Sequence, residues 1–190
     1  MKINQNGRSM VEMLGVLAII GVLSVGAIAG YSKAMHKYKF NKLRNQVVQV
    51  ITNVQTWYMS VNKNTWTANV LNKLIILPEM GTVSNCRHAM GGRCYIGINQ
   101  SARKYIKIGF QDLSYEVCLD LATLDLTGIR YSMMINALNN TAYDGSTCSD
   151  EGGNNKCFMT SQAVTIDKIK DVCGQDKNAI VWYFSNDLED

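Results

Sequence analysis

The chain has 190 residues, a hydrophobic content of 47%, one proline and a formal net charge of +4. This length allows one domain or two small ones. Residues 1–61 contain seven Lys and Arg and one Glu, whereas residues 62–190 contain 12 basic and 14 acidic residues. The basic character therefore belongs to the N-terminal third alone, which argues against a uniformly basic, nucleic-acid-binding protein.

The first notable segment is an uncharged apolar run at residues 13–32, MLGVLAIIGVLSVGAIAGYS. About 20 such residues are needed for a helix to cross the hydrocarbon core of a bilayer. Glu12 directly precedes the run, where a carboxylate is costly, although less so near the interface than at mid-bilayer. A functional role for Glu12 is favoured only when Gly7, five residues earlier, is considered together with it. The alternative is a solvated first-turn acid that suits the helix dipole.

The helical pattern continues beyond the apolar run. No Gly or Pro falls between Tyr31 and Lys63, and apolar residues recur there at steps of three and four. This spacing predicts one helix from about residue 9 to about residue 60, near 75 Å long, with its first half in lipid. Its second half should pack one apolar stripe against the rest of the chain: Phe40, Leu43, Val47, Val50, Val54, Trp57 and Val61.

Five basic residues follow the apolar run: Lys33, Lys37, Lys39, Lys42 and Arg44. The positive-inside tendency would place this side of the span in the cytoplasm. The six cysteines, all beyond residue 62, argue for the opposite side, because an even set there indicates disulfides in an oxidising compartment. A zinc site is less favoured, since no Cys-x-x-Cys pair occurs and His88 is the only histidine among the cysteines. Two interpretations of the basic residues stay open, contacts with acidic neighbours and a collar against lipid headgroups.

The remaining chain predicts an α+β domain in which a small antiparallel sheet lies on the long N-terminal helix. Residues 66–76, 115–124 and 165–172 favour helices, the last with Ile166, Ile169 and Val172 on one face. Residues 95–98, 105–110 and 179–184 favour strands, with a turn at 99–101, and 131–138 is ambiguous. The three tryptophans are expected in the core rather than on a binding platform: Trp57, Trp66 and Trp182.

Residues 144–156, DGSTCSDEGGNNK, have the composition of a loop. Its acids Asp144, Asp150 and Glu151 are weak candidates for calcium, and a solvated loop is the favoured interpretation because their spacing is not that of a helix-loop-helix calcium site. No phosphate loop, nucleophile elbow or two-histidine metal helix occurs in the sequence. We therefore expect neither an enzyme nor a bound cofactor, and no nucleic-acid partner.

Gly7, then Glu12 as the fifth residue after it, then about twenty apolar residues, resembles the processing motif of type IV pilins and pseudopilins. The resemblance implies cleavage after Gly7 by a prepilin peptidase and methylation of Arg8, a position usually held by Phe or Met. It implies that Glu12 neutralises the N-terminus of a neighbouring subunit. The domains would be a leader (1–7), a helix (8–61) and a disulfide-bonded head (62–190).

The head loosely resembles type IVb pilins in the order LPEM, a Gly-Gly pair, IGF and YEVCLDL. In that group a late cysteine pair joins the C-terminal region, which Cys118 and Cys173 fit here. The local pairs would then be Cys86–Cys94 and Cys148–Cys157, one of fifteen possible connectivities.

The function implied is a structural subunit of a type IV pilus. It would be inserted in the bacterial inner membrane as a precursor and polymerised with copies of itself by the pilus assembly machinery on the cell surface. The alternatives are a minor pilin or a type II secretion pseudopilin. From another class, the alternative is a single-pass membrane protein with a ligand-binding, disulfide-rich ectodomain.

Overall fold

The computed structural model describes residues 10–60, 76–99, 105–124, 126, 132–135, 156–159, 166–174 and 177–185. The chain divides into two compact units, Met1–Lys39 and Phe40–Asp190. Helix α1 (Met10–Ser60) supplies the described residues of the first unit and continues into the second. The single long helix expected from residue 9 to residue 60 is therefore confirmed, with ends that agree to within a residue.

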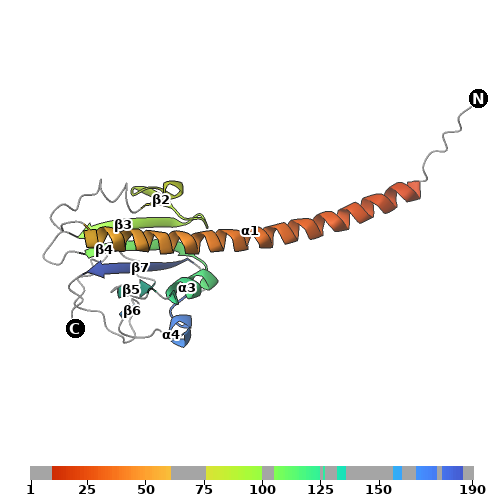
Figure 1. The fold of residues 1–190 in the computed structure, drawn as a ribbon. Helices are drawn as coiled ribbons and strands as arrows, with labels where there is room; N and C mark the ends of the chain where they lie inside the picture. The colour runs from red at the N-terminus through yellow and green to blue at the C-terminus, as the bar shows by residue number, and fades with distance from the viewer. Residues whose placement is uncertain are drawn as a thin grey trace, which may run out of the picture. The chain divides into compact units, whose positions relative to one another are not determined.

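The second unit contains an antiparallel sheet, which with the helices confirms the α+β class. Its described strands are β1 (Gly81–Thr82), β2 (Asn85–Arg87), β3 (Arg93–Asn99), β4 (Tyr105–Leu113), β5 (Ser132–Ile135), β6 (Lys156–Met159) and β7 (Asn178–Ser185). They lie in the order β1-β2-β3-β4-β7-β5-β6, and each pair is antiparallel. The last strand of the chain, β7, thus lies inside the sheet between β4 and β5 (Figure 1).

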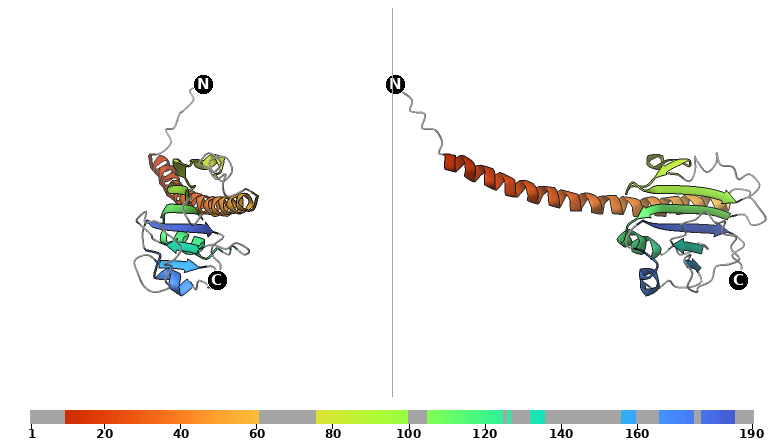
Figure 2. Two further views of the ribbon diagram at one scale, coloured as in Figure 1. Left: turned by 90° about the vertical axis from the view of Figure 1, so that its left-hand side faces the viewer. Right: turned by 180° about the vertical axis from the view of Figure 1, so that it is seen from behind.

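One face of the sheet carries the core of this unit. In the register of the central strands, Ile96 of β3 pairs with Ile108 of β4, which pairs with Trp182 of β7. Side chains alternate between the two faces of a strand, so these residues share one face. Figures 1 and 2 show the second half of α1 lying along this sheet, seen from the front and from behind.

The stripe expected on α1 fills that core. Its fully buried members are Leu43, Val47, Val50, Val54 and Trp57, and Phe40 is partly buried. Ile51, which the stripe did not include, is buried as well, and Val61 lies outside the described residues. Burying each such side chain contributes about 1.5–3 kcal/mol, so this half of α1 is part of the globular unit.

The opposite face of the sheet holds a second apolar cluster: Tyr105, Met134, Val181 and Tyr183, with Tyr95 packed against it. The Tyr95 ring lies over Gly109, where any side chain would overlap it. Burial raises the pKa of the Tyr95 hydroxyl to about 12, because a phenolate is poorly solvated there.

Apart from α1, the helices described in the second unit are short: η2 (Pro78–Met80), α3 (Tyr115–Ala122) and α4 (Ile166–Lys170). Helix α3 buries Val117, Cys118, Leu121 and Ala122. A disulfide joins Cys118 to Cys173 in the turn after α4, and another joins the paired residues Cys86 of β2 and Cys94 of β3. Both bonds agree with the pairing that the family resemblance implied. The third expected pair, Cys148–Cys157, includes Cys148, which lies outside the described residues.

Some local expectations need correction. Ile166 does not share the buried face of Ile169 and Val172. It is 57% exposed, because α4 begins there and has only five residues. Lys156, the last residue of the segment expected to be a loop, begins β6 instead, and residues 144–155 lie outside the described residues. The ambiguous segment 131–138 contains strand β5. The helix expected at 66–76 and Trp66 lie, apart from Ile76, outside the described residues.

Candidate functional site: the N-terminal helix

The apolar part of α1 is not covered by the residues that the structure describes. The large hydrophobic side chains from Met10 to Ile28 are 53–86% exposed. Among the described residues, α1 is the one helix long and apolar enough to cross a membrane, and none of its apolar window is buried. Because these side chains point in every direction around the helix, it is suited to lipid or to a bundle of other apolar helices.

Glu12 lies in the first turn of α1, and its side chain is exposed. The ion pairs between residues that the structure describes are Arg44–Asp120 and Lys170–Asp167, so Glu12 has no basic partner among them. Its position in the first turn places the carboxylate at the positive end of the helix dipole, which favours negative charge there. The proposed cleavage residues Gly7 and Arg8 lie outside the described residues.

Four glycines interrupt the apolar part of α1: Gly15, Gly21, Gly26 and Gly30. A Cβ added at any of them would meet no atom within 4 Å. Packing within the subunit therefore does not require them, and each weakens the helix by about 1 kcal/mol relative to alanine. In membranes, small residues let the backbones of neighbouring helices approach closely.

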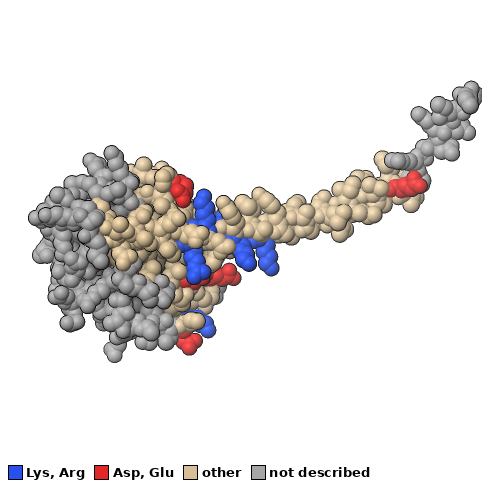
Figure 3. Space-filling model, viewed as in Figure 1, with Lys and Arg blue, Asp and Glu red and all other residues tan. Residues whose placement is uncertain are grey.

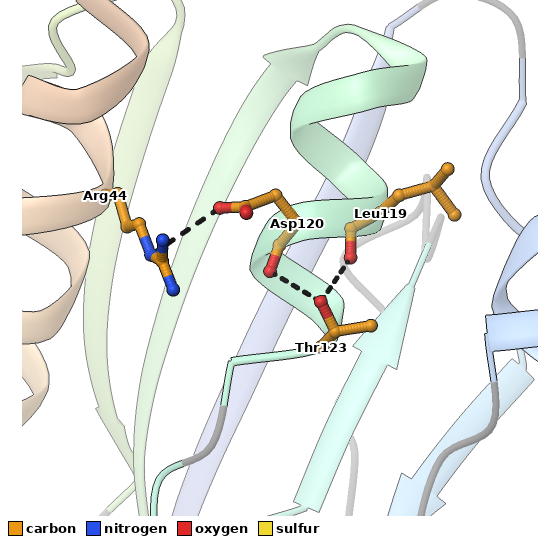
Figure 4. A network of polar contacts seen from close by, with 4 residues as sticks. All are labelled: Arg44, Leu119, Asp120 and Thr123. Atoms are coloured by element: carbon orange, nitrogen blue, oxygen red, sulfur yellow. Dashed lines mark hydrogen bonds and ion pairs between the residues drawn. The ribbon is translucent and has the colours of Figure 1, made fainter.

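Basic side chains gather along α1 after the apolar part (Figure 3). Lys33, Lys37 and Lys39 are exposed, and Lys42 is half-buried. Arg44 differs from them because it has a carboxylate partner. Its Nε lies 3.7 Å from Oδ2 of Asp120 in α3 (Figure 4).

The Arg44–Asp120 pair joins α1 to the end of α3. Thr123 ends α3 by donating its hydroxyl to the carbonyl oxygens of Leu119 and Asp120, each at 3.0 Å (Figure 4). Asp120 Oδ2 is buried and accepts no hydrogen bond from the residues that the structure describes. The positive charge of Arg44 therefore compensates the negative charge of Asp120. The pair contributes little to stability, because the Arg44 side chain is 54% exposed and the Asp120 side chain is 30% exposed.

A polar cluster around His88 holds the β2–β3 turn, and sequence reasoning did not find it. His88 is 3% exposed. Its Nε2 lies 2.8 Å from the carbonyl oxygen of Gln111, and its Nδ1 accepts the backbone N–H of Met90 at 3.2 Å. Next to it, Gln46 of α1 accepts the backbone N–H of Ala89 at 2.9 Å. No local pattern could reveal this cluster, because Gln46 and Ala89 are 43 residues apart.

The cluster also explains two backbone features. Strand β4 has an irregular register with β7 between Phe110 and Leu113, and Asp112 there has a φ of 60°. His88 provides a partner for the Gln111 carbonyl at this bulge. Gly92 faces the His88 ring and the Gln111 carbonyl, which a Cβ would overlap. Burial lowers the pKa of the His88 imidazole, and the hydrogen bond to the Gln111 carbonyl and the negative charge of Asp112 oppose this effect.

The calcium candidates Asp144, Asp150 and Glu151 lie outside the described residues. Within the described ranges, no three His, Cys, Asp or Glu side chains group as metal ligands would.

The chain matches no protein-family model and no curated protein sequence.

Proposed function

We propose that the protein is a structural subunit of a type IV pilus of the type IVb kind, cut after Gly7 and polymerised through α1. The observation that carries the proposal is the position of Glu12. It is the only acidic residue in residues 1–61, and it lies in the first turn of a helix whose apolar side chains are not covered by any described residue.

The α-ammonium group that cleavage would create can pair with the Glu12 carboxylate. Cleavage after Gly7 gives Arg8 a free α-ammonium group, four residues and about one helical turn before Glu12. When apolar helices from many subunits pack together, Glu12 leaves water and needs a positive partner, since an unpaired buried charge is costly. The ammonium group of a neighbouring copy satisfies it in one axial register, so the pair selects the correct stagger of the subunits.

The disulfides of the head are consistent with a location outside the cytoplasm. Two disulfides, Cys86–Cys94 and Cys118–Cys173, join segments of the second unit. Such bonds form and persist in the periplasm and on cell surfaces. The precursor would be held in the bacterial inner membrane by residues 13–32, the prepilin peptidase and assembly machinery would act on it there, and the head would form the filament surface.

The first test is the chemical nature of the N-terminus. Mass spectrometry of the protein from sheared surface fibres should find a chain that begins at methylated Arg8. An intact Met1 on fibre subunits would contradict the proposal.

The second test replaces Glu12 with alanine or glutamine in cells. We expect membrane insertion to persist and fibres to disappear. Glu116→Ala is the matched control, because Glu116 is also an exposed acid in the first turn of a helix, α3. Fibres that form normally from Glu12→Ala, with the leader retained, would overturn the proposal.

A second candidate is a single-pass membrane protein whose disulfide-bonded ectodomain binds a ligand and never polymerises. The apolar helix supports this candidate as well as it supports the pilus subunit, because its length and composition also suit a simple membrane anchor. It predicts an intact Met1 and no fibres. Within the first class, an abundant shed filament marks the major pilin, and loss of secreted enzymes on deletion marks a pseudopilin.

A further inference from the structure

Three lysines follow the apolar run within two turns of α1: Lys33, Lys37 and Lys39, here called the lysine collar. All three side chains are exposed. The ion pairs between described residues involve Arg44 and Lys170 as cations, so no described carboxylate neutralises the collar. The collar is therefore a concentrated positive charge that has no partner among the described residues.

The collar is spread around the helix axis. At about 100° per residue, Lys33 and Lys37 lie about 40° apart, while Lys39 lies about 160° from Lys37. One flat protein surface reaches only one side of a helix. Lipid headgroups surround a membrane-crossing helix on all sides, so they can contact the whole collar at once.

The depth of the collar also suits headgroups. It begins one residue after the apolar run ends at Ser32, and it extends about 9 Å along the helix at 1.5 Å per residue. The polar layer of one leaflet is about 5–8 Å thick, and lysine side chains can reach back toward it. Tyr31 and Tyr38, which are 67% and 61% exposed, occupy the same stretch, and tyrosine is enriched at membrane interfaces.

We propose that the lysine collar binds anionic phospholipid headgroups in the leaflet at the C-terminal end of residues 13–32. The inference rests on the membrane insertion that the proposed function includes, but not on cleavage or polymerisation. The competing partner is a carboxylate of a second copy of the chain, and the experiment separates the two.

The test uses the full-length chain in phosphatidylcholine vesicles that contain phosphatidylglycerol. Electron paramagnetic resonance of spin-labelled lipids measures the association constant of each lipid at the protein surface. We expect a preference of several-fold for phosphatidylglycerol over phosphatidylcholine, since one lysine near an anionic surface contributes at most about fivefold. High salt should reduce the ratio toward one, because it screens exposed charges.

The informative variant is Lys33→Gln/Lys37→Gln/Lys39→Gln, which should lower the ratio close to one. The matched control is Arg93→Gln/Lys170→Gln/Lys177→Gln, which removes three exposed head cations and so changes the net charge equally. It should leave the ratio unchanged. Equal ratios for the wild type and the collar variant would overturn the proposal and leave the second-copy carboxylate as the partner. Extraction of the wild-type chain from vesicles by alkaline carbonate would instead contradict the membrane insertion itself.

Discussion

His88 shows how one buried side chain makes the head sensitive to pH. Because Nδ1 accepts the N–H of Met90, the ring proton of the neutral form is on Nε2 and is donated to Gln111. A second proton on Nδ1 would break the bond to Met90. Burial already holds the pKa of His88 below its ordinary value of 6.5. The native chain therefore binds fewer protons than the unfolded chain at mildly acidic pH.

The first prediction follows from this difference in proton binding. The contribution of His88 to the free energy of unfolding is complete above pH 6.5 and is lost as the pH falls through the lowered native pKa. Its slope reaches at most about 1.4 kcal/mol per pH unit. Urea unfolding of the full chain in neutral detergent, followed by tryptophan fluorescence, measures it. His88→Gln should be less stable overall but lack this slope. His36→Gln, which removes an exposed histidine of α1, should keep it.

Asn178, at the start of β7, is a second buried polar side chain that holds neighbouring segments through hydrogen bonds, and it is 1% exposed. Its Nδ2 donates to the carbonyl oxygens of Leu113 and Gly174 at 3.2 and 2.8 Å, and its Oδ1 accepts the Gly174 N–H at 2.6 Å. The second prediction is that Asn178→Ala lowers the free energy of unfolding by about 2–4 kcal/mol, since three hydrogen bonds are lost around buried groups. Asn85→Ala, at an exposed position of β2, is the control and should cost less than about 1 kcal/mol. Similar losses for the two variants would contradict this role.

At the scale of elements, the two described disulfides should contribute unequally. Cys118–Cys173 joins residues 55 apart, from α3 to the turn after α4, whereas Cys86–Cys94 joins adjacent strands across eight residues. On the chain-entropy estimate the first contributes about 4 kcal/mol and the second about 2.5 kcal/mol. The third prediction is that Cys118→Ala/Cys173→Ala lowers the urea midpoint more than Cys86→Ala/Cys94→Ala does. The reverse order would show that local packing outweighs loop closure here.

Most of the elements that could be predicted from the sequence have a long periodic pattern, although the short helices α3 and α4 were also expected, at 115–124 and 165–172. Helix α1 and strands β3, β4 and β7 each carry their pattern over seven or more residues. Strands β1, β2, β5 and β6 have two to four residues. They were not predicted, because two to four residues are too few to show an alternating pattern. The Arg44–Asp120 pair and the His88 cluster were not predicted because each joins residues distant in sequence, whereas Glu12 and its apolar run are local and could be recognised.

At the scale of the whole molecule, the chain combines two units with different solvent requirements. The apolar part of α1 is long and apolar enough to cross a membrane, its side chains are exposed and none of its apolar window is buried. The second unit has its own core, which includes Leu43, Val47 and Trp57 from the later part of the same helix. One continuous helix therefore has an exposed part that is apolar enough to cross a membrane and a later part that is buried in the second unit.

The fourth prediction tests this division. A chain that begins at Lys33 should stay in solution without detergent, and its urea midpoint should equal that of the full chain when both are measured in the same detergent. The physical reason is that the deleted residues bury none of their apolar window. The matched control begins at Gln49 and so also lacks Leu43, Gln46 and Val47, which are buried. That loss should lower the midpoint or abolish cooperative unfolding, since each buried aliphatic side chain contributes about 1.5–3 kcal/mol. If the chain that begins at Lys33 unfolded as easily as the control, the apolar segment would have to stabilise the head directly, and its role as a surface for lipid or neighbouring subunits would need revision.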